Sequence, residues 1–155
     1  MKFVKDSKMM VCIMSNKIDS FKGKYFFLSN FFESPVTWEG RTYQNNEAAF
    51  QSAKCVKESQ RDKFTSMNPS TSKRAGRNVL LRSDWEDIKE NVMYEVCLAK
   101  FTQNPELGQR LLDTGDAELI EGNDWGDRTW GMVNGVGQNK LGKILMRIRK
   151  ELKND

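Results

Sequence analysis

The residue types best suited to chemistry gather in one short segment, where an amine lies among acids and amides. Glu47, Gln51, Lys54 and Glu58 are three or four positions apart, so in a helix over residues 47–58 they share one face. A lysine whose pKa is lowered by burial can act as a nucleophile, and a neighbouring carboxylate can move a proton. The same pattern is also typical of a solvated, ion-paired helix surface. The pattern alone favours this second interpretation.

A second candidate group lies in a glycine-rich segment nearer the C-terminus. Residues 124–131 contain two acids and two tryptophans, and Asp127 and Trp130 are among them. Tryptophan rings offer large surfaces on which planar bases can stack. We therefore expect Trp125 and Trp130, together with Trp85 and the pair Phe31 and Phe32, to form a wall that binds a base. A location of the tryptophans in the core is an equally good interpretation.

Composition limits the catalytic chemistry. The chain has no histidine, which removes the commonest general base and the commonest zinc ligand. Ser-His-Asp and Cys-His arrangements are therefore excluded. Cys12, Cys55 and Cys97 are too far apart in sequence for a C-x-x-C pair and fit no disulfide framework. We expect buried cysteines, catalysis by lysine, carboxylate, tyrosine or cysteine groups, and neither a metal nor a cofactor.

The segment before the last expected helix contains a false nucleotide-binding motif. Residues 137–143 satisfy G-x-x-x-x-G-K, but Ile144 follows where a nucleotide triphosphatase needs a hydroxyl group. Helical periodicity continues through Gly142, which places this glycine inside a helix. Free backbone N–H groups at the start of that helix, from Gly135 to Asn139, remain a candidate site for one phosphate or ribose.

Several elements can be predicted that would position these groups. Strands are expected over 9–14 and 25–28, and a hairpin over 36–43 with Glu39-Gly40 at its turn. Asn45 and Asn46 are suitable caps for the helix over 47–58. The remaining expected elements are a helical turn over 62–67, a helix from Asp84 or Asp87 to Asn104-Pro105 that carries Ile88, Val92, Val96 and Ala99, a helix over 106–112, a strand over 117–121, an irregular loop over 122–138 and a last helix over 139–152. These elements predict an α+β fold, a mainly helical single domain with a few short strands.

Size and charge define the class of protein. The chain has 155 residues, 38% of them hydrophobic and 30% charged, which suits one domain over 1–155. No apolar run is long enough for a membrane helix or a signal-peptide core, so we expect a cytoplasmic protein without a membrane partner. A net charge of +4 slightly favours anionic partners. The basic residues of the last helix, Lys140, Lys143, Arg147 and Lys150, are more typical of a solvated face than of a nucleic-acid groove.

Several separated motifs, taken in order, resemble one known family. The first is Phe27-Leu-Ser-Asn-Phe-Phe32, and the second is Tyr43-Gln-Asn-Asn-Glu-Ala-Ala-Phe-Gln-Ser-Ala-Lys54. Further matches are Asp84-Trp85, Met93, Lys100-Phe101, Thr114-Gly115-Asp116, Leu119-Ile120-Glu121, Asp127-x-x-Trp130-Gly131 and Gly137-x-Asn139-x-Leu141-Gly142-x-x-Leu145-Met146-x-x-Arg149. Their order and spacing over residues 21–152 resemble the NADAR (YbiA-like) family.

The resemblance implies an N-glycosidase that cleaves a bond between ribose C1 and nitrogen. Two substrate classes are implied, ADP-ribosylated guanine in nucleic acid and phosphorylated aminouracil-ribose intermediates of riboflavin synthesis. The net charge and the basic last helix favour the first. A module that binds ADP-ribose or a related nucleotide without turnover is the alternative, and no protein partner is implied.

The resemblance also implies roles for particular residues. Lys54 would attack C1 after ring opening and form a Schiff base, while Glu47 would shuttle a proton. Asp127 would hold a ribose hydroxyl or act as a second acid or base. Asn30 and Gln51 would hydrogen-bond to the sugar, and we expect Phe31, Trp85, Trp130, Gly131 and Asn139 to complete the substrate-binding residues. The family usually has histidine where this chain has Ala48, whose side chain is expected to point away from Glu47 and Lys54.

Overall fold

A computed structural model describes residues 16–155. The strand expected over 9–14, and Cys12 with it, lie outside these residues. The described part has the predicted α+β architecture, mainly helical with a few short strands. Its elements are β1 (Lys17–Ile18), the 3₁₀-helix η1 (Gly23–Leu28), β2 (Glu33–Trp38), β3 (Arg41–Asn45), α2 (Asn46–Ser52), α3 (Glu58–Lys63), the 3₁₀-helix η2 (Phe64–Ser66), α4 (Pro69–Ala75), α5 (Trp85–Gln103), α6 (Pro105–Leu112), β4 (Glu118–Leu119) and α7 (Lys140–Lys153).

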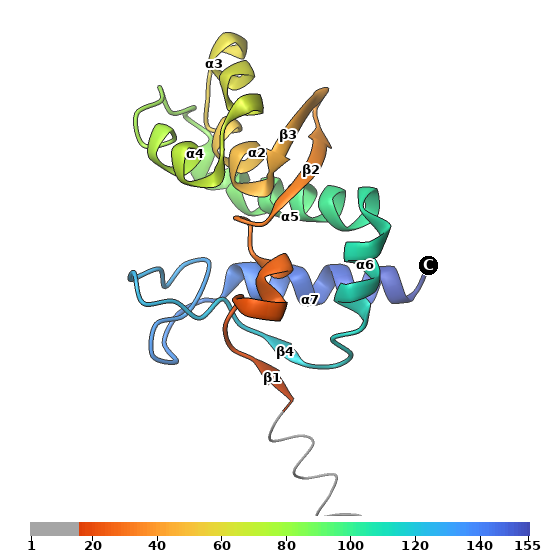
Figure 1. The fold of residues 1–155 in the computed structure, drawn as a ribbon. Coiled ribbons are helices and arrows are strands. Elements are labelled where there is room, and N and C mark those ends of the chain that lie inside the picture. The colour runs from red at the N-terminus through yellow and green to blue at the C-terminus, as the bar shows by residue number, and fades with distance from the viewer. Residues whose placement is uncertain (1–15) are drawn as a thin grey trace, which may run out of the picture.

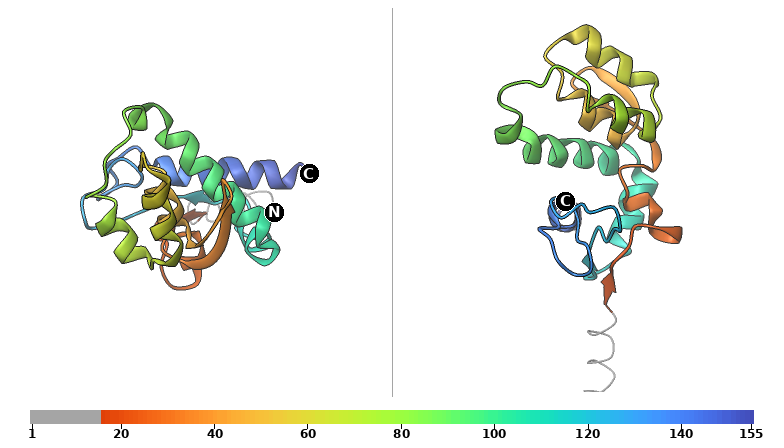
Figure 2. Two further views of the ribbon diagram at one scale, coloured as in Figure 1. Left: turned by 90° about the horizontal axis from the view of Figure 1, so that it is seen from above. Right: turned by 90° about the vertical axis from the view of Figure 1, so that its left-hand side faces the viewer.

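The long helix α5 separates two groups of elements (Figure 1). The hairpin of β2 and β3 and the short helices α2 to α4 lie on one side of it. On the other side lie α7, η1 and the two-stranded parallel sheet of β1 and β4, and the side view shows the same division (Figure 2). The irregular loop between β4 and α7 lies at one end of the molecule, beside the start of α7 (Figure 1). None of the helices described is both long enough and apolar enough to cross a membrane.

The predicted hairpin is confirmed, including its turn. Strands β2 and β3 are antiparallel, and Trp38 pairs with Arg41 across a two-residue connection. Glu39 and Gly40 have φ values of 48° and 80°. Two positive φ angles match the twist of the flanking strands in such a turn.

The strand expected over 25–28 is wrong, because this segment forms the 3₁₀-helix η1. The consecutive side chains of Phe27 and Leu28 are both buried, at 3% and 1% exposed. Successive side chains of a strand point to opposite faces, so a strand at this edge of the core would expose one of them. The tighter helical turn buries both.

Helix α2 begins as predicted but ends six residues early, at Ser52. Asn45 caps it, since the backbone N–H of Ala48 donates to Asn45 Oδ1 over 2.8 Å. Beyond the helix the chain bonds to a distant segment, because the Arg82 N–H donates to the Lys54 carbonyl over 3.0 Å. This interaction between distant segments overrides the local helical pattern.

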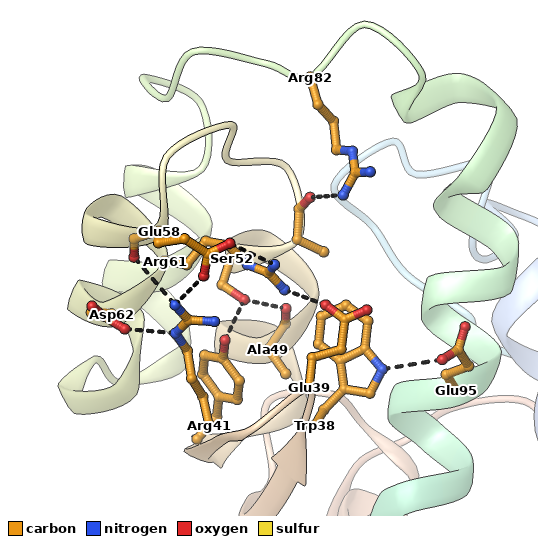
Figure 3. A network of polar contacts seen from close by, with 12 residues as sticks. Trp38, Glu39, Arg41, Ala49, Ser52, Glu58, Arg61, Asp62, Arg82 and Glu95 are labelled. Carbon is orange, nitrogen blue, oxygen red and sulfur yellow. Dashed lines mark hydrogen bonds and ion pairs between the residues drawn. The ribbon is translucent and has the colours of Figure 1, made fainter.

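Glu58 does not continue the expected face of α2. It begins α3 and pairs with Arg41, which also binds Asp62 over 2.6 Å (Figure 3). Arg61 beside it pairs with Glu39 over 2.7 Å. These ion pairs fasten α3 to the hairpin turn and take Glu58 away from the residues it was expected to accompany.

The other helices follow the predicted order, with one addition. Helices α5, α6 and α7 are confirmed within one or two residues of the expected bounds, and the turn expected over 62–67 is divided between α3 and η2. Helix α4 was not expected. Its start carries a recognisable signal, since Asn68 accepts a hydrogen bond from the Thr71 N–H and Pro69 occupies the first turn.

Candidate active site

A pocket of about 700 Å³ lies where α2, α4, the start of α5 and the loop before α7 meet. It brings together segments that are far apart in sequence. Of the ten residues to which the resemblance gives catalytic or substrate-binding roles, eight line it: Asn30, Phe31, Glu47, Gln51, Lys54, Trp85, Asp127 and Trp130. Gly131 and Asn139 are not among its lining residues.

Helix α2, whose residues are all buried, contributes a carboxyl and an amide. Glu47 and Gln51 are 7% and 6% exposed, and Gln51 Nε2 donates to Glu47 Oε1 over 3.2 Å. Burial raises the pKa of Glu47, while the bond from Gln51 and the charges of Lys73 and Lys54 oppose the rise. The solvated ion-paired surface favoured by the sequence pattern is therefore wrong for these two residues.

Lys54 lies half-buried in the turn after α2. Burial lowers its pKa, and the nearby Glu47 opposes this effect. Its Nζ is 5.8 Å from the centroid of the Trp85 ring. The Arg82 N–H fixes the Lys54 backbone through the bond described above, so the amine projects from a fixed point. A lysine in this position reaches its uncharged, nucleophilic form at lower pH than an exposed lysine does.

The loop before α7 supplies the acids of the other wall. Asp127 Oδ1 accepts hydrogen bonds from the N–H groups of Thr129 and Trp130, over 3.0 and 2.9 Å. The Asp127 N–H in turn donates to Asn123 Oδ1 over 3.0 Å. These bonds fix the carboxylate and use only one of its two oxygens. Glu121, which was not predicted as a site residue, lines the same wall.

Aromatic rings form a continuous surface along the pocket. The Phe50 ring lies between Trp85 and Trp130, with centroid distances of 5.1 and 5.4 Å. Trp125 also lines the pocket and is 54% exposed. Trp38 lies elsewhere, against Arg61, and its Nε1 points to Glu95 (Figure 3).

The phenylalanine pair contributes only one ring to the pocket. Phe31 lines it, whereas the Phe32 ring packs against Phe26 and is absent from the lining. Phe26 itself takes part in the lining. The wall expected to bind a base therefore lines the pocket at Phe31, Trp85, Trp125 and Trp130, but not at Phe32.

Cationic residues around the pocket were missed by the sequence analysis. Lys22, Lys73, Arg77 and Lys89 all line it, and Lys89 pairs with Glu86 over 2.6 Å. Lys73 Nζ lies 5.8 Å from the Phe31 ring and 5.5 Å from the Trp125 ring. Prediction of α4 from its Asn68-Pro69 start would have placed Lys73 in a helix, whereas Arg77 lies beyond the end of this helix at Ala75.

The start of α7 does not offer free amides for a phosphate. The N–H groups of residues 138–141 donate to the carbonyls of Arg128, Gly131, Thr129 and Trp130, over 2.7 to 3.2 Å. The Asn139 side chain is also bonded, with its Oδ1 accepting from the Glu121 N–H and its Nδ2 donating to the Leu119 carbonyl. At the anion site expected here from the sequence, the N–H groups of Val136, Gln138 and Asn139 are therefore bonded to the protein's own backbone.

Ala48 lies away from the pocket, as expected, and its side chain is fully buried. Cys55 and Cys97 are both buried, as predicted for the cysteines. Across residues 16–155, no three or more acidic or cysteine side chains gather in a way that would hold a metal ion.

Comparison with known proteins identifies a family. A family model described as the NADAR domain matches residues 18–153. N-glycosidase YbiA of Shigella boydii is 39% identical over 132 residues, which cover 83% of this chain and 82% of that protein. The riboflavin biosynthesis protein VVA0006 of Vibrio vulnificus is 35% identical over 130 residues, 81% of this chain and 35% of that longer protein. The solution structure of Escherichia coli YbiA is similar with a TM-score of 0.79 and 35% identity, covering 89% of this chain and 84% of that one.

Proposed function

The chain belongs to the NADAR domain family, and from this premise we propose that it hydrolyses the bond between C1 of a phosphorylated ribose and the nitrogen of a planar base. One observation carries the proposal. The pocket places the amine of Lys54, whose pKa is lowered, and the buried carboxyl of Glu47 beside a row of aromatic rings. This combination provides a nucleophile, a proton carrier and a surface for the base.

Lys54 is the proposed nucleophile. The lone pair of the glycosidic nitrogen opens the ribose ring: the bond between C1 and the ring oxygen breaks, the ring oxygen takes a proton from the Glu47 carboxylic acid, and C1 becomes an imine carbon. The uncharged Lys54 Nζ adds to C1 and loses one proton to the Glu47 carboxylate. The base then leaves with the electron pair of its bond to C1, and a lysine Schiff base remains. Water hydrolyses the Schiff base, which releases the sugar and restores the amine.

The surrounding side chains are proposed to bind the substrate. Gln51 and Asn30 offer amide groups to the sugar hydroxyls, although Asn30 also contacts Asn46 and Met93. Asp127 holds a ribose hydroxyl with its second carboxylate oxygen. Phe31, Trp85 and Trp130 contact the base. Gly131 and Asn139, which were expected to bind substrate, act behind the pocket wall instead.

The phosphate is proposed to lie beside Lys73 and Arg77. Within residues 16–155 neither side chain forms an ion pair, and both line the pocket. Lys22 adds a third cation to the lining. This group of side chains takes the place of the helix start that the sequence suggested.

The choice between the two substrates depends on charge outside the pocket. The sequence argument for ADP-ribosylated guanine in nucleic acid used the basic residues of α7. In the structure Lys140 pairs with Glu90, and Arg147 pairs with Glu151 over 3.5 Å. This weakens the argument for a polyanion. The Vibrio vulnificus relative is a riboflavin biosynthesis protein, which supports the phosphorylated aminouracil-ribose compound, and we place this substrate first.

Two measurements test the proposal. Borohydride added during turnover should trap a ribosyl group on Lys54, detected by mass spectrometry of the digested protein. Lys54→Ala should lose both trapping and turnover, while Lys57→Ala, at an exposed lysine in the same turn, should keep both. Undiminished turnover by Lys54→Ala refutes the Schiff base. Tight nucleotide binding with no turnover by the unmodified chain would instead indicate the binding module.

The dependence of kcat/KM on salt concentration distinguishes the two candidate substrates. A nucleic-acid substrate that contacts several phosphates loses kcat/KM steeply as salt rises, because each neutralised phosphate releases a counterion. A monophosphate changes much less. Hydrolysis of ADP-ribosylated guanine DNA at low salt, with the aminouracil compound left intact, would reverse our order of substrates.

A further inference from the structure

Glu121 is a pocket carboxyl that the steps above do not use. It follows β4 and lies on the same wall as Asp127. Its Oε2 atom is buried and has no hydrogen-bond partner. An unpartnered buried carboxyl oxygen costs free energy in the empty protein. A substrate group could supply the missing partner.

The backbone of Glu121 is held more firmly than its place in a loop suggests. Its N–H donates to Asn139 Oδ1 over 3.0 Å, and its carbonyl accepts from the Met132 N–H over 2.9 Å. Gly131 lies so close that a Cβ there would be 2.0 Å from the Glu121 carbonyl oxygen. Asn139 and Gly131 were expected to bind substrate, but they fix the position of this acid.

We propose that Glu121 is the general acid of the reaction and gives its proton to the base nitrogen as the bond to C1 breaks. This inference rests on the proposed function. The inference assigns the proton transfers to two carboxyls that lie on different walls of the pocket. Glu47, on α2, takes the proton that Lys54 loses, and Glu121, on the loop, supplies the proton that the base needs.

The balance of the reaction requires such a donor. The electron pair of the C1–N bond leaves with the base, and its nitrogen takes the proton of the Glu121 carboxylic acid. Water then adds to the Lys54 Schiff base and transfers one proton to the Glu121 carboxylate. The acid is thereby restored, and the sum of the steps is addition of one water molecule across the glycosidic bond.

The surroundings of Glu121 favour its protonated form near neutrality. Burial raises its pKa to about 7, and the facing carboxyls of Asp127 and Glu47 contribute to the rise. Lys73 from α4 and Lys22 from the segment before η1 act in the opposite direction. A general acid works best when its pKa lies close to the working pH.

The test compares Glu121→Gln with Glu118→Gln, which removes an exposed carboxyl three residues earlier. Glu121→Gln should lower kcat by about a hundredfold to ten-thousandfold and change KM far less, whereas Glu118→Gln should keep both. For the unmodified enzyme, the active form needs Lys54 uncharged and Glu121 protonated, so kcat/KM should rise with pH and then fall at high pH. The residual activity of Glu121→Gln should lack the fall.

The outcomes are distinct. An enzyme that turns over no N-ribosyl substrate refutes the proposed function and this inference with it. Turnover with an unchanged kcat in Glu121→Gln, or a lowered kcat that keeps the same fall at high pH, refutes Glu121 alone. Where Glu121→Gln does not fold, Glu121→Asp provides the same measurement. Its shorter carboxyl should lower kcat and shift the pH profile of kcat/KM, and an unchanged kcat with an unshifted profile refutes the inference.

Discussion

Replacement of Lys100 should reveal an unusual dependence of stability on pH. Lys100 lies on α5 with its side chain 1% exposed, and its Nζ donates to the carbonyls of Phe27 and Ser29 over 2.6 and 3.0 Å. These bonds fasten the end of η1, just before the pocket residues Asn30 and Phe31. Burial lowers the pKa of Lys100 from 10.5 to about 8, Arg110 adds to this, and Cys97 opposes it.

The size of this change in unfolding free energy follows from the linkage between proton binding by Lys100 and folding. The unfolded chain keeps the lysine proton up to about pH 10.5, whereas the folded chain releases it near pH 8. The folded state therefore gains stability as the pH rises from 8 to 10.5, and it loses this stability again as the pH falls back to 8. At about 1.36 kcal/mol per pH unit, the whole interval corresponds to about 3 kcal/mol. About 2 kcal/mol of it should be present by roughly pH 9.5.

Urea unfolding from pH 7 to 9.5 measures the effect in the unmodified chain and in Lys100→Met. The difference between their unfolding free energies should change by about 2 kcal/mol in favour of the unmodified chain. This difference largely cancels other groups, including the Cys97 thiol, whose pKa burial raises to about 12. Lys150→Met removes an exposed lysine of α7 and should give a constant difference. A constant difference for Lys100→Met as well would refute the reasoning.

Three further substitutions test the packing and the charge of the site. Gly142→Ala should destabilise the protein by about 1–3 kcal/mol in urea unfolding, because its Cβ would lie 2.1 Å from the Leu119 carbonyl oxygen; a gain in stability from the better helix former would contradict this. Gly76→Ala should lower kcat/KM by about tenfold to a hundredfold. The new Cβ would lie 1.9 Å from Gln51 Oε1 and would displace the Gln51 amide from Glu47. An unchanged kcat/KM would show that this amide is dispensable. Lys73→Met should raise KM by about tenfold through loss of a charged phosphate contact. Arg74→Met changes an exposed residue of the same helix, and an equal rise in its KM would show that the effect is not local.

The sequence predicts those parts of the fold that depend on short-range rules. The hairpin turn at Glu39-Gly40 and the cap at Asn45 are decided by residues within a few positions. Spacing in α2 likewise brings Glu47 and Gln51 onto one face. The family resemblance adds Asn30 and a role for Asp127, and no local rule connects these two residues to the rest of the pocket. The roles of these residues remain predictions.

The remaining features depend on contacts between distant segments. Helix α2 ends where the Lys54 carbonyl bonds to the Arg82 N–H, and no residue near position 54 signals this partner. Burial of Glu47 depends on neighbours from other elements, so an acid and an amine on one helix face cannot be identified as a site from spacing alone. Glu121 was missed because its environment is made by the loop, by α4 and by Asn139 just before α7.

The backbone bonds between the loop and the start of α7 have a consequence for local opening. Carbonyls of residues 128–131 accept from the N–H groups of residues 138–141, so this part of the loop cannot detach without breaking the bonds at the start of the helix. Amide protons of residues 138–141 should therefore exchange with solvent as slowly as those inside a helix, and together with one another. The wall that carries Asp127 is thus expected to be present before substrate arrives.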